Sequence, residues 1–104
     1  MIDIIKYGEF KPVGKQKKKH QIILTHTSRN INDYLQSLKF RLNGKYKKIP
    51  NYIITRDGKI LQLLGNNEHS EYFKDPNINR NSIIISLENL GWLQKEPLSD
   101  YYIN

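Results

Sequence analysis

Hydrophobic residues cluster between positions 21 and 27, where the chain reads Gln-Ile-Ile-Leu-Thr-His-Thr. A short run of apolar and β-branched residues of this length is typical of a buried strand. The run ends in hydroxyl and imidazole side chains, those of Thr25, His26, Thr27 and Ser28. Functional groups often follow the carboxyl ends of strands in α/β sheets, so this stretch is the first candidate for chemistry.

The hydrophobic period changes after residue 30. Apolar side chains then recur at the spacing of one helical face, at Ile31, Tyr34, Leu35, Leu38 and Leu42. Asn30 is a suitable N-cap, and Gly44 is suitable as the residue just beyond the last turn. The pattern predicts an amphipathic helix between these two residues.

Two further strands are predicted at residues 51–55 and 60–64, joined by the turn residues Asp57 and Gly58 into a hairpin. Residues 68–81 are polar and predict a long loop, and residues 82–88 predict another buried strand. The first twenty residues, with lysines at 15 and 17–19, predict a basic arm or loop. This order predicts an α/β fold with a single mixed central β-sheet flanked by helices, formed by residues 21–104.

Length and composition restrict the classes of protein that the chain can belong to. Its 104 residues and 12.3 kDa allow one domain, and the absence of cysteine excludes disulfides and thiolate metal ligands. No apolar run approaches the roughly 20 residues of a membrane span, and the start does not resemble a signal peptide. We therefore expect synthesis in the cytoplasm. The net charge of +7 favours an anionic partner.

The three histidines differ in their prospects as functional residues. His20 and His26 are six residues apart, about 20 Å along an extended chain, so they cannot share a metal ion. His26 ends a hydrophobic strand and can present its imidazole from a rigid support. A histidine satisfied by a neighbouring hydroxyl or carbonyl is the alternative for this residue.

Several motifs, taken in order, resemble the zinc N-acetylmuramoyl-L-alanine amidases, which share a fold with phage amidase-type lysozymes and peptidoglycan recognition proteins. The resemblance covers residues 21–92 and rests on four segments. These are Ile22–Ser28, Ile49–Ile60 with Arg56-Asp57-Gly58, Glu68–Ser70, and Asn81–Asn89. It implies an enzyme that hydrolyses the amide bond between N-acetylmuramic acid and L-alanine in peptidoglycan, as in cell wall degradation and phage lysis.

The resemblance also implies roles for single residues. His26 matches the first zinc ligand, and Tyr52 lies near the position of a tyrosine that contacts the reacting centre. His69 and Asn81 match positions associated with the substrate cleft. The family's carboxylate falls at Ser86, and Glu88, two residues on, is the side chain that could supply it. Whether Glu88 is a catalytic carboxylate or an exposed strand-end residue stays open.

The family completes its zinc site with two ligands far downstream, and this sequence has no residue that matches them. Either the sequence is the N-terminal portion of a longer amidase, which we favour, or catalysis has been lost. A non-catalytic peptidoglycan-binding module of the same fold is therefore the alternative. A basic nucleic-acid-binding domain is disfavoured because no recognition motif accompanies the lysines. We expect a monomer without a membrane span that acts on the cell wall or on its recycled fragments.

Overall fold

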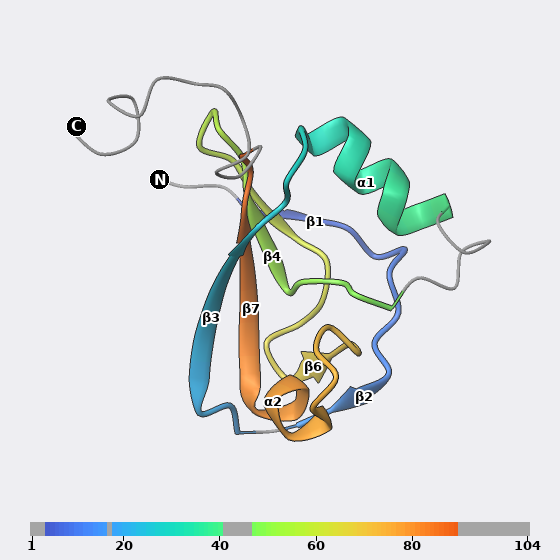
Figure 1. Cartoon of the computed structure of the whole chain (residues 1–104), viewed down its shortest axis with the longest axis vertical. Helices are drawn as coiled ribbons and strands as arrows, with labels where there is room; N and C mark the ends of the chain where they lie inside the picture. Colours follow the sequence, from blue (N-terminus) through green and yellow to red (C-terminus); the bar gives the residue numbers. More distant parts are fainter. Residues whose placement is uncertain (1–3, 17, 41–46, 90–104) are drawn as a thin grey trace.

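A computed structural model describes residues 4–16, 18–40 and 47–89 of the chain (Figure 1). Their centre is a five-stranded sheet with the order β1-β5-β4-β7-β3. The strands are β1 (Ile4–Lys6), β3 (Gln21–His26), β4 (Tyr52–Ile54), β5 (Ile60–Gln62) and β7 (Ser82–Leu87). The pair β4 and β5 is antiparallel, whereas β3 and β4 both run parallel to β7, so the sheet is mixed as predicted.

The predicted hairpin and the two strands that became β3 and β7 are confirmed, with ends shifted by a few residues. The prediction that the first of them is buried was wrong, because β3 lies at the edge of the sheet and its Ile22 and Leu24 are exposed. Gly58 adopts a φ of 87° at the hairpin turn, a conformation that glycine accepts without steric cost. The predicted helix is α1 (Ile31–Phe40), and its expected end at Gly44 lies outside the described residues. Local pattern was sufficient here because each element carries its own period and its own turn residues.

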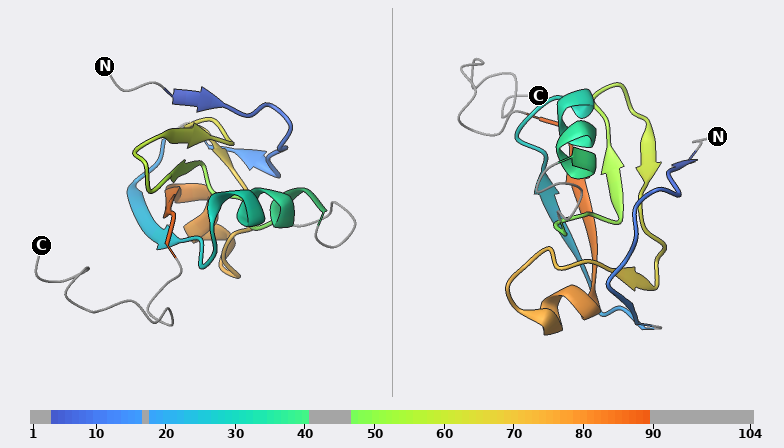
Figure 2. Two further views of the ribbon diagram at one scale, coloured as in Figure 1. Left: turned by 90° about the horizontal axis from the view of Figure 1, so that it is seen from above. Right: turned by 90° about the vertical axis from the view of Figure 1, so that its right-hand side faces the viewer.

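Helix α1 covers one face of the sheet (Figure 2). Its Tyr34 and Leu38 are buried in one cluster with Ile53 of β4 and Leu61 of β5. Ile84, at the centre of β7, is only 1% exposed. The side chains that alternate with these residues point to the other face, where Figures 1 and 2 show no helix of the described chain.

The first twenty residues differ from the predicted arm. Residues 4–6 form β1 along the edge of the sheet, and β2 (Gly14–Lys15) pairs with β6 (Glu68–His69) in a separate two-stranded sheet. Phe10 between them is buried in the core. The prediction was wrong because these strands are short and gain their partners from residues more than fifty positions away.

The predicted loop at 68–81 is also wrong in part, since it contains β6 and α2 (Pro76–Asn81). Asp75 is the N-cap of α2 and accepts a hydrogen bond from the Asn77 amide at 2.8 Å, and Pro76 occupies the first turn. Three asparagines within six residues hid this helix, because asparagine has a low helix propensity. No helix within the described ranges is long and apolar enough to cross a membrane.

Candidate functional site

His26 is the last residue of β3, at the carboxyl end of the sheet, and its side chain is exposed. The ring Nδ1 lies 2.8 Å from Oγ of Ser28, two residues further along the chain. In the tautomer whose Nδ1 proton is donated to that hydroxyl, Nε2 presents its lone pair to a ligand. A hydrogen bond on the other ring nitrogen is the usual way in which proteins orient a metal-binding histidine.

The loop that follows His26 is held in an unusual conformation. Ser28 has a φ of 60°, in the left-handed region that residues other than glycine seldom adopt. Its neighbour Thr27 is buried, and the Thr27 hydroxyl donates to the carbonyls of Arg29 and Asn89. The loop is thereby tied to the end of β7, and the Ser28 hydroxyl is kept beside the imidazole. Strained backbone of this kind is concentrated at functional sites.

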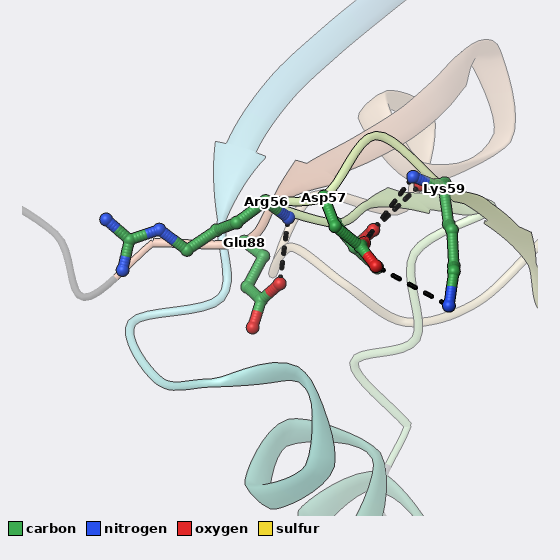
Figure 3. Close-up of polar contacts among 5 residues, drawn as sticks. Arg56, Asp57, Lys59 and Glu88 are labelled. Carbon is green, nitrogen blue, oxygen red and sulfur yellow. Dashed lines mark hydrogen bonds and ion pairs between the residues drawn. The ribbon is translucent and has the colours of Figure 1, made fainter.

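Glu88 lies just beyond β7 and joins three parts of the carboxyl end. Its Oε2 accepts a hydrogen bond from the backbone amide of Ile31, the first residue of α1, at 2.6 Å. Its Oε1 accepts one from the Arg56 amide at 2.9 Å, as Figure 3 shows. A carboxylate has about four acceptor directions, so both oxygens retain further capacity. Glu88 therefore already performs one task, which is to hold α1 and the hairpin turn together.

The hairpin turn beside Glu88 is ordered by Asp57. Its carboxylate accepts a hydrogen bond from the Thr55 hydroxyl and lies 3.5 Å from Nζ of Lys59 (Figure 3). The Thr55 hydrogen bond, aided by the Lys59 charge, lowers the pKa of this exposed carboxyl. The side chain of Asp57 is thus engaged in forming the turn.

Tyr52 lies on the same open face of the sheet as His26, but two residues nearer the amino end of β7. Tyr52 is opposite Ile85 of β7, whereas His26 is opposite Leu87, so the two side chains are separated across β7 and along it. The Tyr52 hydroxyl donates to Oδ1 of Asn66 and accepts from Nε2 of Gln62 at 3.2 Å. Ser86, the alternative carboxylate position, is fully buried on the opposite face, with no hydrogen-bond partner for its hydroxyl among the described residues.

His69 and Asn81 lie at the amino end of the sheet, away from His26. Asn81 accepts a hydrogen bond from the His20 amide next to the start of β3, and β3 then rises about 17 Å to His26. His69 belongs to β6, which pairs with β2 at the same end (Figure 1). Of the residues predicted from the sequence, His26 and Glu88 thus share one end, and His69 and Asn81 share the other.

The surroundings of His69 disfavour its charged form. Burial lowers the pKa of the imidazole, and the positive charges of Lys19 and Arg80 lower it further. Nδ1 is buried without a hydrogen-bond partner in the described part of the chain. The ring also packs against Gly14, where an added Cβ would lie 2.7 Å from its Cε1. These contacts are those of a neutral packed ring.

Zinc requires more ligands than the described residues bring together. Within residues 4–16, 18–40 and 47–89, no three His, Asp or Glu side chains are placed to hold one metal ion. His26 fits as one ligand, because its ring is exposed and oriented by Ser28. A catalytic zinc site has three protein ligands, so the others would have to come from outside these ranges.

A surface hollow of about 730 Å³ lies next to the loop after His26, and Arg29 is the lining residue nearest to His26 in the sequence. The hollow follows the outer side of α1 and is lined by Arg29, Asp33, Gln36, Ser37 and Phe40. Arg29 can pair with a carboxylate, the amide and hydroxyl groups can bind polar ligand atoms, and Phe40 offers an apolar surface. Asp33 adds a negative charge to the positive charge of Arg29, so the lining is mixed in charge and does not select one class of ligand.

Asn51, which the sequence analysis did not single out, directly precedes β4 at the amino end of the sheet and organises the backbone there. It is 1% exposed, and its Nδ2 donates to the carbonyls of Gly65 and Glu68 at 2.9 and 3.0 Å. Its Oδ1 accepts from the Ile84 amide at 3.0 Å. The one available signal was an asparagine at the first position of the strand predicted at 51–55, since a polar side chain that becomes buried there must find hydrogen-bond partners.

Comparison with solved structures identifies a similar fold in a mutant endolysin from Bacillus subtilis. The TM-score is 0.54 with 24% sequence identity, and the match covers 86% of this chain. The chain spans 64% of the length of that endolysin. At this identity the likeness concerns the fold. No protein-family model matches the sequence, and no curated protein matches it.

Proposed function

We propose that the chain is a zinc-dependent N-acetylmuramoyl-L-alanine amidase domain that cuts the bond between the glycan and the stem peptide of peptidoglycan. The observation that carries the proposal is the placement of His26. In a fold shared with an endolysin, His26 ends the edge strand β3, which runs parallel to β7, exposes its imidazole and is oriented by Ser28. This is the position from which a metal ligand acts in sheets that bind ligands at their carboxyl ends.

His26 would be one zinc ligand, and residues outside the described ranges would supply the others. Bound zinc polarises a carbonyl and lowers the pKa of its water to about 7, which is what amide hydrolysis at neutral pH requires. Glu88 is proposed as the carboxylate that moves a proton at this end of the sheet, using the acceptor capacity left beside its two backbone hydrogen bonds.

Tyr52 is proposed to bind a substrate oxygen through its hydroxyl on the face that it shares with His26. The hollow along α1 would take the adjoining part of the substrate, with Arg29 paired to a stem-peptide carboxylate. His69 and Asn81 lie too far from His26 to touch the same bond. If they bind substrate, they would bind a remote part of the polymer.

The test uses the protein expressed from its complete reading frame. Zinc content is measured by mass spectrometry of the purified protein, and release of stem peptides from muropeptides is followed by chromatography. We expect one zinc per chain and hydrolysis, both lost in His26→Ala and both kept in the matched control His20→Ala. Zinc bound without His26, or hydrolysis that survives His26→Ala, would contradict the proposal.

A peptidoglycan-binding module without catalysis is the second candidate, motivated by the lack, within residues 4–16, 18–40 and 47–89, of three His, Asp or Glu side chains placed to hold one metal ion. It predicts that the protein sediments with purified sacculi but releases no peptide. Sacculus binding that is weakened in Arg29→Ala, together with no zinc and no peptide release from the unmodified protein, would support this candidate over the amidase.

A further inference from the structure

Basic side chains gather at the amino end of the sheet, on the side of the molecule away from His26. Lys15 in β2 and Lys18 are exposed, and Lys19 is half-buried. Arg80, which is also exposed, lies in the last turn of α2. Figures 1 and 2 show β2, β6, α2 and the start of β3 together at this end. We call Lys15, Lys18, Lys19 and Arg80 the basic surface.

Backbone hydrogen bonds hold the segments of the basic surface side by side. The Gln16 amide donates to the Asn67 carbonyl at 2.6 Å, and the His20 amide donates to the Asn81 carbonyl at 2.8 Å. The chain that leads from β2 to β3 is thus attached next to β6 at one point and at the end of α2 at the other. The lysines and the arginine therefore share one end of the fold, although they lie far apart in the sequence.

The positive charges of the basic surface are not neutralised by ion pairs within the described chain. Neither Lys15 nor Lys18 has an ion pair among the described residues, where the paired lysines belong to other parts of the fold. Nζ of Lys19 donates to the carbonyl of Glu68 at 3.0 Å. The Arg80 guanidinium donates to a side-chain amide oxygen of α2. Both of these acceptors are uncharged, so the two cations keep their full charge.

The carboxylates that belong to these elements are engaged by backbone amides. Glu68 is opposite Lys15 in the register of β2 and β6, but its Oε1 accepts a hydrogen bond from the Gly65 amide at 2.6 Å. Asp75 caps α2 by accepting from the Asn77 amide at 2.8 Å. An excess of positive charge therefore remains at this end of the molecule.

His69, which lies in β6, is affected by two of these cations together. Burial lowers the pKa of its imidazole most, and the charges of Lys19 and Arg80 lower it further. One of these cations precedes β3 and the other belongs to α2, so two separate segments direct positive charge to the same region. Such convergence raises the local concentration of anionic ligands.

An exposed basic surface of this kind suits a polymer with repeated negative charges. Lysine presents a flexible point charge and lacks the planar geometry that fits one fixed anion. A phosphodiester chain offers a charge in every unit, so several contacts form together. Nucleic acids share this chemistry, but proteins that bind single strands add aromatic side chains on which bases stack. Residues 14–20, 66–70 and 76–82 contain no Phe, Tyr or Trp, which favours a phosphodiester polymer without bases.

We propose that the basic surface binds a phosphodiester polymer of the cell wall, of the poly(glycerol phosphate) class. The choice of a wall polymer rests on the proposed function, whereas the surface itself uses neither His26 nor zinc. The length of β3, about 17 Å, separates the surface from His26, so the protein can hold this polymer while its other end acts on peptidoglycan. Attachment at a second point keeps the enzyme concentrated at the wall.

The test measures the binding of fluorescently labelled poly(glycerol phosphate) by anisotropy, with EDTA present and with the protein expressed from its complete reading frame. We expect saturable binding at about 50 mM salt. If all four cations of the surface release counterions, a slope of about −0.7 per charge predicts about a 50-fold loss of affinity between about 50 and 200 mM salt. The assay contains no peptidoglycan, so its result does not depend on whether the protein hydrolyses muropeptides.

Two double variants with the same net charge distinguish this surface from the charge of the whole chain. Lys15→Gln with Lys18→Gln removes two exposed charges of the basic surface and should weaken binding about tenfold or more. Lys47→Gln with Lys59→Gln removes two exposed lysines that pair with carboxylates elsewhere, and should weaken it less than about twofold. Lys15→Arg with Lys18→Arg keeps the charges and should bind like the unmodified protein.

Three results would overturn the proposal. Equal weakening by the two glutamine variants would mean that net charge alone explains the binding. Absence of binding to poly(glycerol phosphate) at about 50 mM salt would show that the surface does not bind this polymer. Tighter binding to single-stranded or duplex nucleic acid than to the polymer, at the same salt concentration, would assign the surface to nucleic acid instead.

Discussion

The amino and carboxyl ends of the sheet are built differently. At the amino end, side chains of Asn51, Ser70 and Asn79 are buried and bonded to backbone groups, those of Gly65 and Ile49 for the first two and of the nearby Phe73 for Asn79. At the carboxyl end, His26, Ser28 and the turn residue Arg56 are exposed. The carboxylate of Glu88 and the hydroxyl of Thr27 join the segments there by long-range side-chain bonds.

The amino end of the sheet contributes mainly to stability, whereas the carboxyl end presents the side chains that can act on a ligand. Buried amide and hydroxyl side chains at the amino end supply hydrogen-bond partners to loop backbone groups that would otherwise be unsatisfied. The amino end therefore stabilises the fold. The carboxyl end leaves an imidazole accessible and holds it on a rigid strand, which is where ligands bind in open α/β sheets. Substitutions at the two ends should therefore have different consequences, and substitutions at four positions test the contrast.

The largest effect is expected for Asn51→Ala. The substitution removes the acceptor of the buried Ile84 amide. It also removes one of the two donors to the carbonyls of Gly65 and Glu68, which keep the Glu68 amide and Nζ of Lys19. We expect a loss of about 3 kcal/mol in the free energy of unfolding, measured by urea denaturation. Asn67→Ala, an exposed control two residues after Gly65, should change stability by less than about 0.5 kcal/mol. If the two variants lose the same stability, the hydrogen bonds of Asn51 do not stabilise the amino end of the sheet.

A smaller loss of stability is expected for Glu88→Gln. Glutamine can accept one of the two backbone hydrogen bonds, but its NH₂ group faces the other amide, so we expect a loss of about 2 kcal/mol. Hydrogen exchange should accelerate at the amides of Ile31 and Arg56 in particular. Glu71→Gln is the control, since this exposed carboxylate only pairs with Lys47. Unchanged exchange at both amides would mean that Glu88 does not join α1 to the turn.

Two substitutions of Ser28 distinguish the cost of its left-handed backbone from the contribution of its hydrogen bond to His26. Both Ser28→Gly and Ser28→Ala remove the hydroxyl next to His26, but only glycine accepts a φ of 60° freely. We expect the glycine variant to be more stable than the alanine variant by about 1 kcal/mol in thermal or urea unfolding. If the two variants are equally stable, the left-handed conformation at this position costs nothing.

The smallest effect concerns pH and His69. Because the folded state lowers the pKa of His69 below its ordinary 6.5, the unfolded chain binds a proton more readily. This contribution to stability is present above about pH 6.5 and is lost as the pH falls through the lower pKa of the folded state. His69→Leu should therefore flatten the decline in stability between about pH 7 and pH 5, measured by urea unfolding at each pH.

The matched control for that titration is His20→Leu, which removes an exposed histidine from the same end of the molecule. A decline that is equally steep in wild type and in His69→Leu would show that the packed imidazole of His69 does not contribute to acid sensitivity.

Sequence pattern located the elements that carry their own signals. The aliphatic runs of β3 and β7, the helical spacing of α1 and the Asp57-Gly58 turn each lie within a short window, and each was predicted. β1, β2 and β6 have two or three residues and depend on partners far along the chain, so no local period marks them. His26 was identified from its place at a strand end, which is also a local feature.

The relations between site residues were decided by tertiary structure alone. The sequence could place Glu88 near the end of a strand, but its bonds to Ile31 and Arg56 span 57 and 32 positions. It could not show that His69 and Asn81 lie at the other end of the sheet from His26. Strand order and register set those distances, and both depend on which strands pair.

The sequence by itself therefore determined an α/β chain with a central sheet, a hairpin, one amphipathic helix and a histidine at the carboxyl end of a strand. The tertiary structure decided which polar groups share an end and which face of the sheet α1 covers. It also showed that the aliphatic surface of β3 and β7 is open in the described chain. The physical reason is that periodicity is encoded by neighbours in sequence, whereas pairing and burial depend on contacts between residues far apart along the chain.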